Sequence, residues 1–483
     1  IKVENTYISY CTINENTKII YNSSFTRCGN LTSIEIPDGV TSIGDRAFED
    51  CSKLTSITIP DSVTSIGIDA FEGCSGRVIY ITDVATWCKI SGLHNLMRHG
   101  SDYKKLYLNG ELVTDLVIPD SVTSIGDYTF RNCSELTSII ISDSVASIGD
   151  DAFHGCSGLT SITIPDGVTS IGNSAFSDCS GLTDINIPNS VTYIGNLVFE
   201  NCSRLTSVTI GKDVTNIGDC AFEGCSGLVN VIWNAENCTK VGSYSSIYSN
   251  GKYNYNDDHT IFKGCYKLTD ITIGDNVKNI PNYAFYGCSG LTSVKIGKSV
   301  TGIGDYGFYG CNGLANIYIT DLVAWCNISE IYNLMRYGFY NKNLYLNGEL
   351  VTDLVIPDEV TSIAPFGFSA FSKLASITMS DNVTSIGSRA FLGCSGLTRV
   401  IIGEGITRIG YEAFYGIGGL VSVIIPESVT SIEGDAFRCC SKLSSIEFKG
   451  TKEQWNNIAK NGSWNLETGN YTIHCIDGDI VKS

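Results

Sequence analysis

The stretch from Leu159 to Gly181, LTSITIPDGVTSIGNSAFSDCSG, decides the fold, because close copies of it recur along the chain at intervals of 23 residues. A fixed period of this length is typical of a solenoid, in which each repeat forms one coil of a continuous spiral. Within the unit, LTSITI alternates apolar and polar residues. This alternation predicts a short strand that directs Leu159, Ile162 and Ile164 towards a core.

The rest of the unit predicts a turn, a second extended segment and a corner that closes the coil. Residues 165–167, Pro-Asp-Gly, are turn-forming residues. VTSIG at 168–172 predicts a second short extended segment, which Gly172 ends. SAFSDC at 174–179 predicts a helical turn that directs Phe176 and Cys179 into the core.

Two columns of apolar residues show that the repeat continues through most of the chain, for about seventeen coils. The leucine column contains Leu31, Leu54, Leu136, Leu159, Leu182, Leu205, Leu228, Leu268, Leu291, Leu314, Leu374, Leu397, Leu420 and Leu443, with Val351 in one coil. Fifteen of the 19 phenylalanines form a second column: Phe25, Phe48, Phe71, Phe130, Phe153, Phe176, Phe199, Phe222, Phe262, Phe285, Phe308, Phe368, Phe391, Phe414 and Phe437. Burial of each ring stabilises the fold by roughly 1.5–3 kcal/mol, so we assign this column to the core.

A cysteine column lies three residues after the phenylalanines. It contains Cys28, Cys51, Cys74, Cys133, Cys156, Cys179, Cys202, Cys225, Cys265, Cys288, Cys311, Cys394 and Cys440. The same position holds Phe371 and Ile417 in two coils, so it behaves as an apolar pocket and not as half of an obligatory disulfide. We therefore predict buried free thiols that act as small hydrophobic side chains.

The unit I-P-D-x-V-T-S-I-G-x-x-A-F-x-x-C-x-x-L, as in Ile164 to Leu182, resembles the BspA-like leucine-rich repeat family over nearly the whole chain. Proteins of this family are typically exported surface proteins of host-associated bacteria and of some mucosal protozoa, and they are associated with adhesion to host proteins, other cells or matrix. The resemblance therefore implies a cell-surface or secreted location and an adhesive role. The period by itself indicates only a scaffold.

Insertions interrupt the register at residues 77–112, 229–267 and 315–350. The first and third are copies: IYITDVATWCKISGLHNLMRHG from Ile79 matches IYITDLVAWCNISEIYNLMRYG from Ile317, and LYLNGELVTDLVIPD follows in both. Each predicts a short helix with an inward tryptophan and a hairpin with an Asn-Gly tip. These modules either pack against the flank of the solenoid or bind a partner.

GTKEQWNNIAK predicts the same helix-plus-hairpin plan at the C-terminus, with a capping box from Thr451 to Gln454. The end of a solenoid has to be covered, since exposed strands otherwise pair with other chains. We therefore expect an N-terminal capping repeat at residues 1–30, a solenoid with insertions at 31–445, and a C-terminal cap at 446–483.

The middle insertion, NAENCTKVGSYSSIYSNGKYNYNDDHT, is rich in Ser, Gly, Asn and Tyr, the composition that antibody loops use for recognition. It is followed by tyrosines at the corners of the next two coils. The candidate ligand-binding residues are Tyr244, Tyr248, Tyr253, Tyr255, Trp233, Tyr283, Tyr286, Tyr306 and Tyr309. The alternative is a loop that folds back on the solenoid with its tyrosines packed down.

Charge and motifs exclude several classes of function. The formal net charge is −18 and basic runs are absent, which argues against nucleic acid and anionic membranes as partners. No apolar stretch is long enough to insert into a membrane. The chain lacks a Gly-rich phosphate loop, a CxxC pair and HExxH, so we expect no cofactor, no metal and no catalytic residues.

The sequence therefore predicts an α/β solenoid, a curved, right-handed leucine-rich-repeat array with short strands, helical turns and a capped C-terminus. We expect a monomeric, non-catalytic, adhesin-like binding protein, located outside the cell or at its surface, that recognises a host or matrix protein or a glycan. One alternative is a structural spacer without a ligand of its own. Another is a carbohydrate-binding accessory protein that stacks sugars on the Tyr-rich loop.

Overall fold

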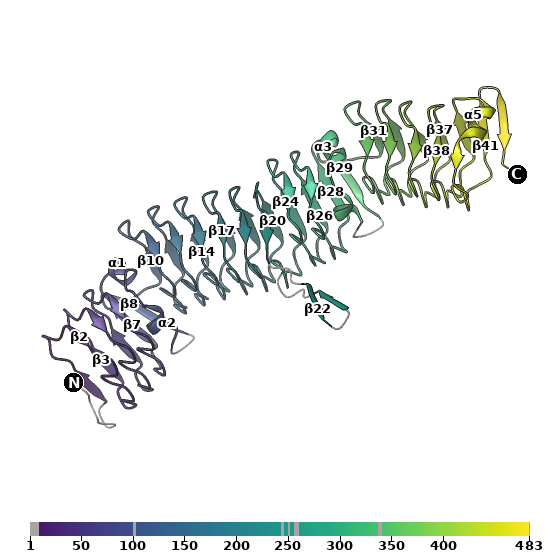
Figure 1. The fold of residues 1–483 in the computed structure, drawn as a ribbon. Helices are drawn as coiled ribbons and strands as arrows, with labels where there is room; N and C mark the ends of the chain where they lie inside the picture. Colours follow the sequence, from purple (N-terminus) through teal and green to yellow (C-terminus); the bar gives the residue numbers. More distant parts are fainter. Residues whose placement is uncertain are drawn as a thin grey trace. The chain divides into compact units, whose positions relative to one another are not determined.

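The computed structural model describes residues 9–99, 103–242, 246–249, 252–255, 260–336 and 341–482, with the backbone alone for 246–249 and 252–255. The chain forms two compact units, Ile1–Val231 with Cys238–Lys267 and Ile232–Asn237 with Leu268–Ser483. Each unit is a β-solenoid of leucine-rich repeats, made mostly of short strands with little helix (Figure 1). The boundary between the units lies in the chain segment of the predicted middle insertion.

In the first unit every regular coil contributes one longer and one two-residue strand. The longer strands are β1 (Tyr10–Thr12), β3 (Ser33–Glu35), β5 (Ser56–Thr58), β7 (Val78–Ile81), β8 (Lys105–Leu108), β10 (Asp115–Val117), β12 (Ser138–Ile140), β14 (Ser161–Thr163), β16 (Asp184–Asn186) and β18 (Ser207–Ile210); β20 (Asn230–Trp233) runs into the second unit. The two-residue strands are β2 (Ile19–Ile20), β4 (Ser42–Ile43), β6 (Ser65–Ile66), β11 (Ser124–Ile125), β13 (Ser147–Ile148), β15 (Ser170–Ile171), β17 (Tyr193–Ile194), β19 (Asn216–Ile217) and β21 (Lys240–Val241).

The second unit repeats this plan. Its longer strands are β24 (Asp270–Ile273), β26 (Ser293–Ile296), β28 (Asn316–Ile319), β29 (Asn343–Leu346), β31 (Asp353–Ile356), β33 (Ser376–Met379), β35 (Arg399–Ile401), β37 (Ser422–Ile425), β39 (Ser445–Phe448) and β41 (Thr472–Cys475). Its two-residue strands are β25 (Asn279–Ile280), β27 (Gly302–Ile303), β32 (Ser362–Ile363), β34 (Ser385–Ile386), β36 (Arg408–Ile409), β38 (Ser431–Ile432) and β40 (Ala459–Lys460).

The strand register confirms the 23-residue period. Ser33 pairs with Ser56 in a parallel ladder of longer strands, and Ser147 pairs with Ser170 in a parallel ladder of two-residue strands. In β14 the central Ile162 is buried and its neighbours Ser161 and Thr163 face outward, and buried and outward residues alternate in the same way in four-residue strands such as β18. Alternation along the strand therefore places one row of side chains in the core and leaves two rows on the surface.

The predicted helical turn at the Phe-Cys corner is not confirmed. Arg46 and Asp50, which flank Phe48, have φ values of 52° and 59°. Residues in this left-handed region cannot continue a right-handed helix. Three alternate N–H groups from Arg46 to Asp50 instead donate to carbonyl oxygens of the next coil at 2.7–2.9 Å. The corner is a series of turns that forms a third hydrogen-bonded ladder between coils.

The phenylalanine column forms a stacked core in each unit. Phe153, Phe176 and Phe199 are fully buried, and their ring centroids are 5.4 and 5.5 Å apart with nearly parallel planes. In the second unit Phe391 stacks on Phe368 at 5.5 Å and on Phe414 at 5.3 Å. The prediction that this column fills the core is confirmed.

The cysteine column is also buried, as predicted, and all twenty cysteines of the chain are free thiols. The structure gives most of these thiols a further role. The Sγ of Cys179 donates to the carbonyl oxygen of Phe153 in the preceding coil at 3.2 Å, and Cys202 does the same to Phe176 at 3.3 Å. Each such thiol therefore occupies an apolar site and satisfies a buried carbonyl group.

Each duplicated insertion contains the short helix and the hairpin that the sequence predicts, and also a second short helix that it does not predict. The first consists of α1 (Val84–Trp87), α2 (His94–Met97) and a hairpin of β8 with β9 (Glu111–Leu112). The second consists of α3 (Leu322–Cys326), α4 (Tyr332–Met335) and a hairpin of β29 with β30 (Glu349–Leu350). Trp87 and Trp325 are buried, and each indole N–H donates at 3.1 Å to a carbonyl oxygen 42 residues further along. Both modules thus pack onto a neighbouring coil of their own unit.

The C-terminal segment contains α5 (Lys452–Asn457) and an antiparallel pair of β41 with β42 (Gly478–Val481). The predicted capping box is present, since Thr451 and Gln454 each bond the backbone of the other. In the middle insertion, β22 (Ser246–Ser249) pairs antiparallel with β23 (Lys252–Tyr255).

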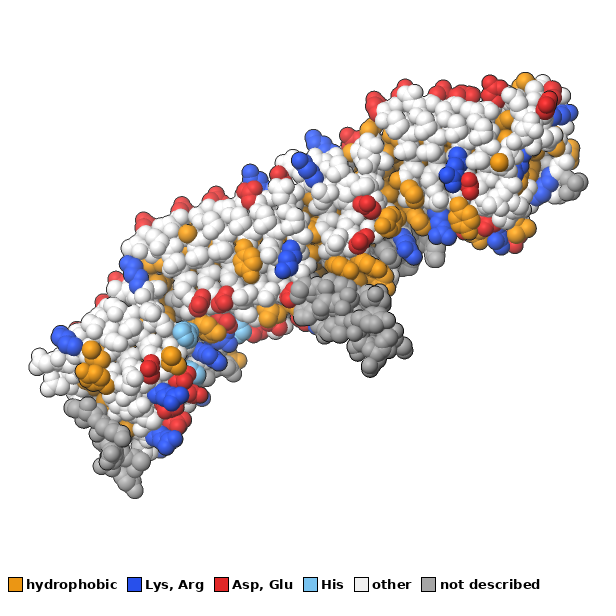
Figure 2. Space-filling model, in the orientation of Figure 1, with side chains coloured by type: hydrophobic (Ala, Val, Ile, Leu, Met, Phe, Trp, Pro, Cys, Tyr) orange, Lys and Arg blue, Asp and Glu red, His pale blue; other side chains and the backbone are white. Residues whose placement is uncertain are grey.

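Much of the acidity has a structural use. The side chain of Asp150 accepts the backbone N–H of Asn173 in the next coil at 2.6 Å, and Asn173 accepts the N–H of Asn196 at 2.9 Å. Figure 2 shows acidic side chains at intervals along one edge of the coils, on a face that is otherwise mostly uncharged. The negative charge is therefore spread along the repeat, with no single acidic centre on this face.

Candidate functional site: a tyrosine array on the second unit

Four of the predicted ligand-binding residues lie together on the second unit. Tyr283 and Tyr306 come two residues before the buried phenylalanines of successive coils, and Tyr286 and Tyr309 come one residue after them. The corner ladder aligns these coils, because the Tyr283 N–H donates to Asp305 at 3.0 Å and the Gly287 N–H donates to Tyr309 at 2.8 Å. Residues spaced 23 apart therefore lie directly beside each other.

The four rings form a two-by-two group, which we call the tyrosine array. Across the coils, Tyr283 stacks on Tyr306 at 5.3 Å and Tyr286 stacks on Tyr309 at 5.1 Å. Within each coil, the centroids of Tyr283 and Tyr286 are 5.9 Å apart and those of Tyr306 and Tyr309 are 5.7 Å apart. These separations are those of favourable aromatic pairs, so the rings hold each other in place.

The array is accessible to a ligand. Tyr306 and Tyr309 are 37% and 40% exposed, whereas Tyr283 and Tyr286 are half-buried. In the other coils the same two corner positions carry charged side chains about as often as uncharged ones. The two coils of the array are the ones that carry an aromatic residue at both positions, so the array is an uncharged aromatic surface.

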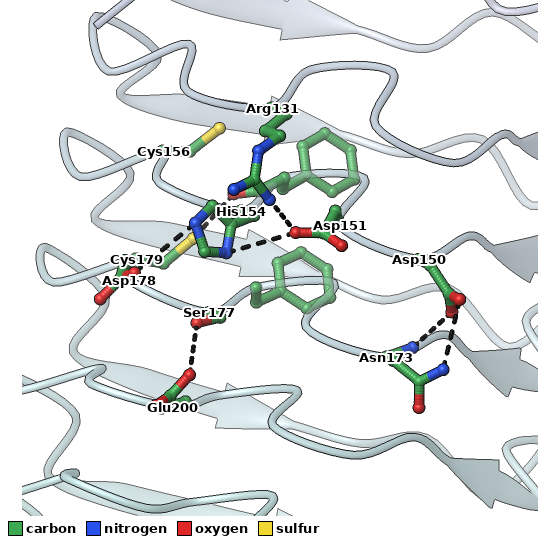
Figure 3. Close-up of polar contacts among 12 residues, drawn as sticks. Arg131, Asp150, Asp151, His154, Cys156, Asn173, Ser177, Asp178, Cys179 and Glu200 are labelled. Atoms are coloured by element: carbon green, nitrogen blue, oxygen red, sulfur yellow. Dashed lines mark hydrogen bonds and ion pairs between the residues drawn. The ribbon is translucent and has the colours of Figure 1, made fainter. Parts of the chain in front are cut away.

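The ionic version of this corner is clear in the first unit (Figure 3). His154 lies between Asp151 and Asp178, with its ring nitrogens 3.5 and 3.6 Å from their carboxylate oxygens, and Arg131 pairs with Asp151. Ser177 bonds Glu200, and burial raises the pKa of the Glu200 carboxyl. Each of these side chains has a polar partner in a neighbouring coil, which explains how a corner of stacked coils tolerates them.

Trp233 does not belong to the ligand-accessible surface. It lies in β20 and is fully buried, with its ring edge-on to Phe285 at 5.5 Å. Phe285 in turn lies in the coil that carries Tyr283 and Tyr286. Trp233 therefore packs behind the array as part of the core, and we remove it from the candidate site.

The loop tyrosines form a separate set. Tyr248 and Tyr253 occupy opposite positions in the β22–β23 pair, and Tyr255 lies opposite Ser246. Tyr244 lies outside the described residues. These residues belong to the first unit and the array belongs to the second. They are therefore two candidate surfaces, each with its own test.

Sequence analysis missed two further aromatic pairs on the outward strand face. Tyr80 packs on Tyr107 at 5.0 Å in the first duplicated module, and Tyr318 stacks on Tyr345 at 4.5 Å in the second. The sequence feature that could have revealed these pairs is a Tyr at the third position of two successive strands. The strands are VIYI and KLYL in the first module, and NIYI and NLYL in the second. None of the other longer strands of the coils in the described part of the chain has Tyr at this third position.

Several thiols of the cysteine column are not activated nucleophiles. Burial raises the pKa of Cys133, Cys179 and Cys394 to about 12, so these groups stay protonated near neutral pH. Within the described residues, no group of three or more His, Cys, Asp and Glu side chains is placed to hold a metal ion. None of the helices in the described part of the chain is long and apolar enough to cross a bilayer.

Parallel ladders of short strands that stack at a 23-residue period around a leucine-lined core define a leucine-rich-repeat solenoid. The chain belongs to the family with the BspA type leucine-rich repeat region, whose model matches in six copies over residues 3–87, 103–229, 258–344 and 339–467. This confirms the family that the repeat unit resembles.

Several solved structures are similar to this chain, among them leucine-rich repeat proteins. One from Bacteroides ovatus is 23% identical, with 91% of each chain covered and a TM-score of 0.45. A leucine-rich cell surface protein from Faecalibacterium prausnitzii is 30% identical over 72% of this chain and 90% of that chain, with a TM-score of 0.30. The pneumococcal vaccine antigen PcpA is 17% identical over 90% of this chain and 93% of that chain, with a TM-score of 0.28. No curated protein matches the sequence.

Proposed function

We propose that this protein is a non-catalytic, adhesin-like binding protein that acts as a monomer outside the cell or at its surface. Its partner is a host or matrix protein or a glycan. Membership of the leucine-rich repeat family supports a binding or scaffold role at this coarse level. The observation that carries the finer proposal is the tyrosine array, in which stacked rings are held ready at an accessible corner.

The physical case for the array rests on preorganisation. Tyrosine supplies a large contact area with few rotatable bonds, so little conformational entropy is lost when a partner binds. Here each ring already packs against two others, which reduces that cost further. The phenol groups add hydrogen-bonding capacity at the rim of an otherwise apolar surface.

The two ends of the solenoid need capping segments. We propose that residues 1–30 cap the N-terminal end and that 446–483 cap the C-terminal end. An aromatic cluster supports the second cap: Trp464 meets Phe437 at 6.2 Å and Trp455 at 6.1 Å, and both tryptophans are buried. These rings cover the end of the phenylalanine column in place of a further coil.

Replacing Tyr306 and Tyr309 together by serine is expected to weaken binding at least about tenfold, because exposed, preorganised tyrosines commonly act as binding hot spots. Binding of the full chain to purified matrix proteins and to a glycan array checks this. Tyr193→Ser is the matched control, since Tyr193 is 39% exposed on a strand of the first unit. An unchanged affinity in the double variant would remove the array from the binding surface.

Two alternative functions have distinct outcomes in the same experiment. A structural spacer would show no saturable binding to any matrix protein or glycan. A carbohydrate-binding accessory protein would bind glycans through the loop. In that case replacement of Tyr244, Tyr248, Tyr253 and Tyr255 by serine would abolish capture while the array variant retained it.

A further inference from the structure

The outward face of the first coils, at the purple end of the chain in Figure 1, contains a hollow of about 330 Å³. Tyr10 and Tyr80 stand at its two ends. Tyr10 is 56% exposed, and Tyr80 is held in position by the neighbouring ring of Tyr107. We call this hollow the strand-face groove; its outward side chains are Tyr10, Ser33, Glu35, Ser56, Thr58 and Tyr80.

The register explains why the groove forms at this place. Tyr10 shares one outward row with Ser33 and Ser56, and Tyr80 shares the other outward row with Glu35 and Thr58. Strands β1 and β7 are three strand spacings apart, which is about 14 Å. Two large rings therefore flank a floor of mostly small side chains.

The polar groups on the floor are available to a ligand. Other hydroxyls on these coils are already in use, since Thr32 donates to the Ser9 carbonyl at 2.9 Å and Thr55 donates to the Thr32 carbonyl at 3.3 Å. Within residues 9–99, no hydrogen bond of the structure involves the side chain of Ser33, Glu35, Ser56 or Thr58. The backbone groups beneath them are paired in the parallel ladder. A ligand here meets side chains and not an open strand edge.

A second hollow of about 540 Å³ continues the groove. Glu35 and Thr58 line both hollows, and Glu15 and Asp38 add further carboxyl groups to the second. None of the described residues that line the two hollows is Lys or Arg. The described part of the combined surface therefore offers aromatic rings, hydroxyl groups and several hydrogen-bond acceptors.

We infer that the strand-face groove binds a neutral oligosaccharide. Sugar rings present C–H faces that pack on tyrosine, and their many hydroxyl groups donate to carboxylates and exchange hydrogen bonds with Ser and Thr. The carboxyl groups of Glu15, Glu35 and Asp38, with no Lys or Arg among the described lining residues, disfavour sulfated or sialylated sugars, because like charges repel in the bound state. The inference deepens the proposed binding function by adding a site on the first unit and a ligand class.

An extended peptide fits this surface less well. Peptides that bind to sheets usually add a strand to a free edge, where backbone hydrogen bonds provide affinity. The groove lies on a sheet face, and its backbone groups are already satisfied. A peptide would therefore place its own N–H and C=O groups over a floor with few partners for them.

The test uses the full chain on an array of neutral oligosaccharides of N-acetylglucosamine, mannose and galactose, printed beside sulfated oligosaccharides. Hits are then titrated by calorimetry. Tyr10→Ala and Tyr80→Ala are each expected to weaken binding at least about tenfold through loss of stacking area. Glu35→Gln preserves the shape of the groove and is expected to weaken binding about fivefold or more by removing a charged acceptor. Tyr193→Ala is the control, and far-UV circular dichroism establishes that each variant is folded.

The inference is overturned if no neutral oligosaccharide binds, if sulfated ones bind better, or if all three groove variants bind as the parent does. Binding of a matrix protein that competes at the groove, without glycan binding, would also overturn it. The double variant of Tyr306 and Tyr309 separates the two sites. Glycan binding that survives in this variant and is lost in the groove variants supports the groove, whatever the outcome for the array.

Discussion

Raising the pH from 7.5 to 10 is expected to unfold most of the protein, because buried thiols resist ionisation only in the folded state. Burial raises the pKa to about 12 for a set of cysteines in both units: Cys88, Cys133, Cys179, Cys220, Cys238, Cys311, Cys326, Cys394 and Cys440. An unfolded thiol ionises at pH about 8.5–9. The stability linked to each thiol is fully present below that pH, and it is lost as the pH rises towards 12.

The size of the effect follows from the number of thiols. Each thiol with a raised pKa costs the folded state about 1.4 kcal/mol per pH unit above its unfolded pKa. The nine thiols with a pKa of about 12 together cost roughly 12 kcal/mol at pH 10, which rivals the whole stability of a typical domain.

A buried lysine acts in the opposite direction. Burial lowers the pKa of Lys342 to about 8, so its contribution to stability rises as the pH increases from about 8 to 10.5. One such group contributes only about 3 kcal/mol at pH 10. The thiols therefore dominate, and the net change is a loss of stability.

Urea titrations at pH 7.5, 9 and 10, followed by circular dichroism in the presence of reductant, measure this loss. A variant with valine in place of Cys133, Cys156 and Cys179 should show a smaller pH dependence, by about 1.4 kcal/mol per replaced thiol per pH unit. The chain itself places Ile417 in this column, fully buried, so an apolar side chain is compatible with the site. Equal midpoints at pH 7.5 and 10, or equal slopes in both proteins, would contradict the role of the thiols.

The period of the sequence predicts the ladders, because residues that recur every 23 positions have to stack once one coil is assigned. The period does not predict the backbone conformation of the Phe-Cys corner. Its left-handed residues include Leu197, with a φ of 58°, and Arg46, with a φ of 52°, and these residue types do not indicate such a conformation. Hydrogen bonding to the next coil imposes it. The local pattern SAFSDC is equally compatible with one turn of helix, so the prediction failed there.

The positions of candidate binding residues could be predicted where the 23-residue repeat is regular. They could not be predicted where the register changes. Tyr283 and Tyr306 are 23 residues apart at one corner position, so their contact follows from the period. Trp233 comes shortly after Leu228, the last leucine of the column before the middle insertion, and in sequence it resembles an aromatic residue of a loop. In the structure it ends the strand NVIW and is buried. The strand-face groove required the structure, since Tyr10 and Tyr80 lie on different rows of the sheet and the step from Thr58 to Tyr80 is 22 residues instead of 23.

Phe176→Ala is expected to destabilise the first unit by about 3–5 kcal/mol, the usual cost of truncating a buried aromatic side chain. Phe176 is fully buried and stacks on Phe153 and Phe199, so the truncation leaves a cavity and removes contacts on both sides. In a solenoid each coil is stabilised mainly by its neighbours, and a defect in the middle weakens two interfaces at once. Urea unfolding of the full-length variant at pH 7.5 measures the change.

The column provides its own control in Phe25→Ala. Phe25 lies at the N-terminal end of the stack, is 7% exposed and pairs with Phe48 alone among the described rings, at 5.1 Å. Its truncation breaks one interface and is expected to cause local fraying of the first coil, with a global cost well below that of Phe176→Ala. If the two variants lost equal stability, or if Phe176→Ala cost less than about 1 kcal/mol, the stacked phenylalanines could not be the core that stabilises the first unit.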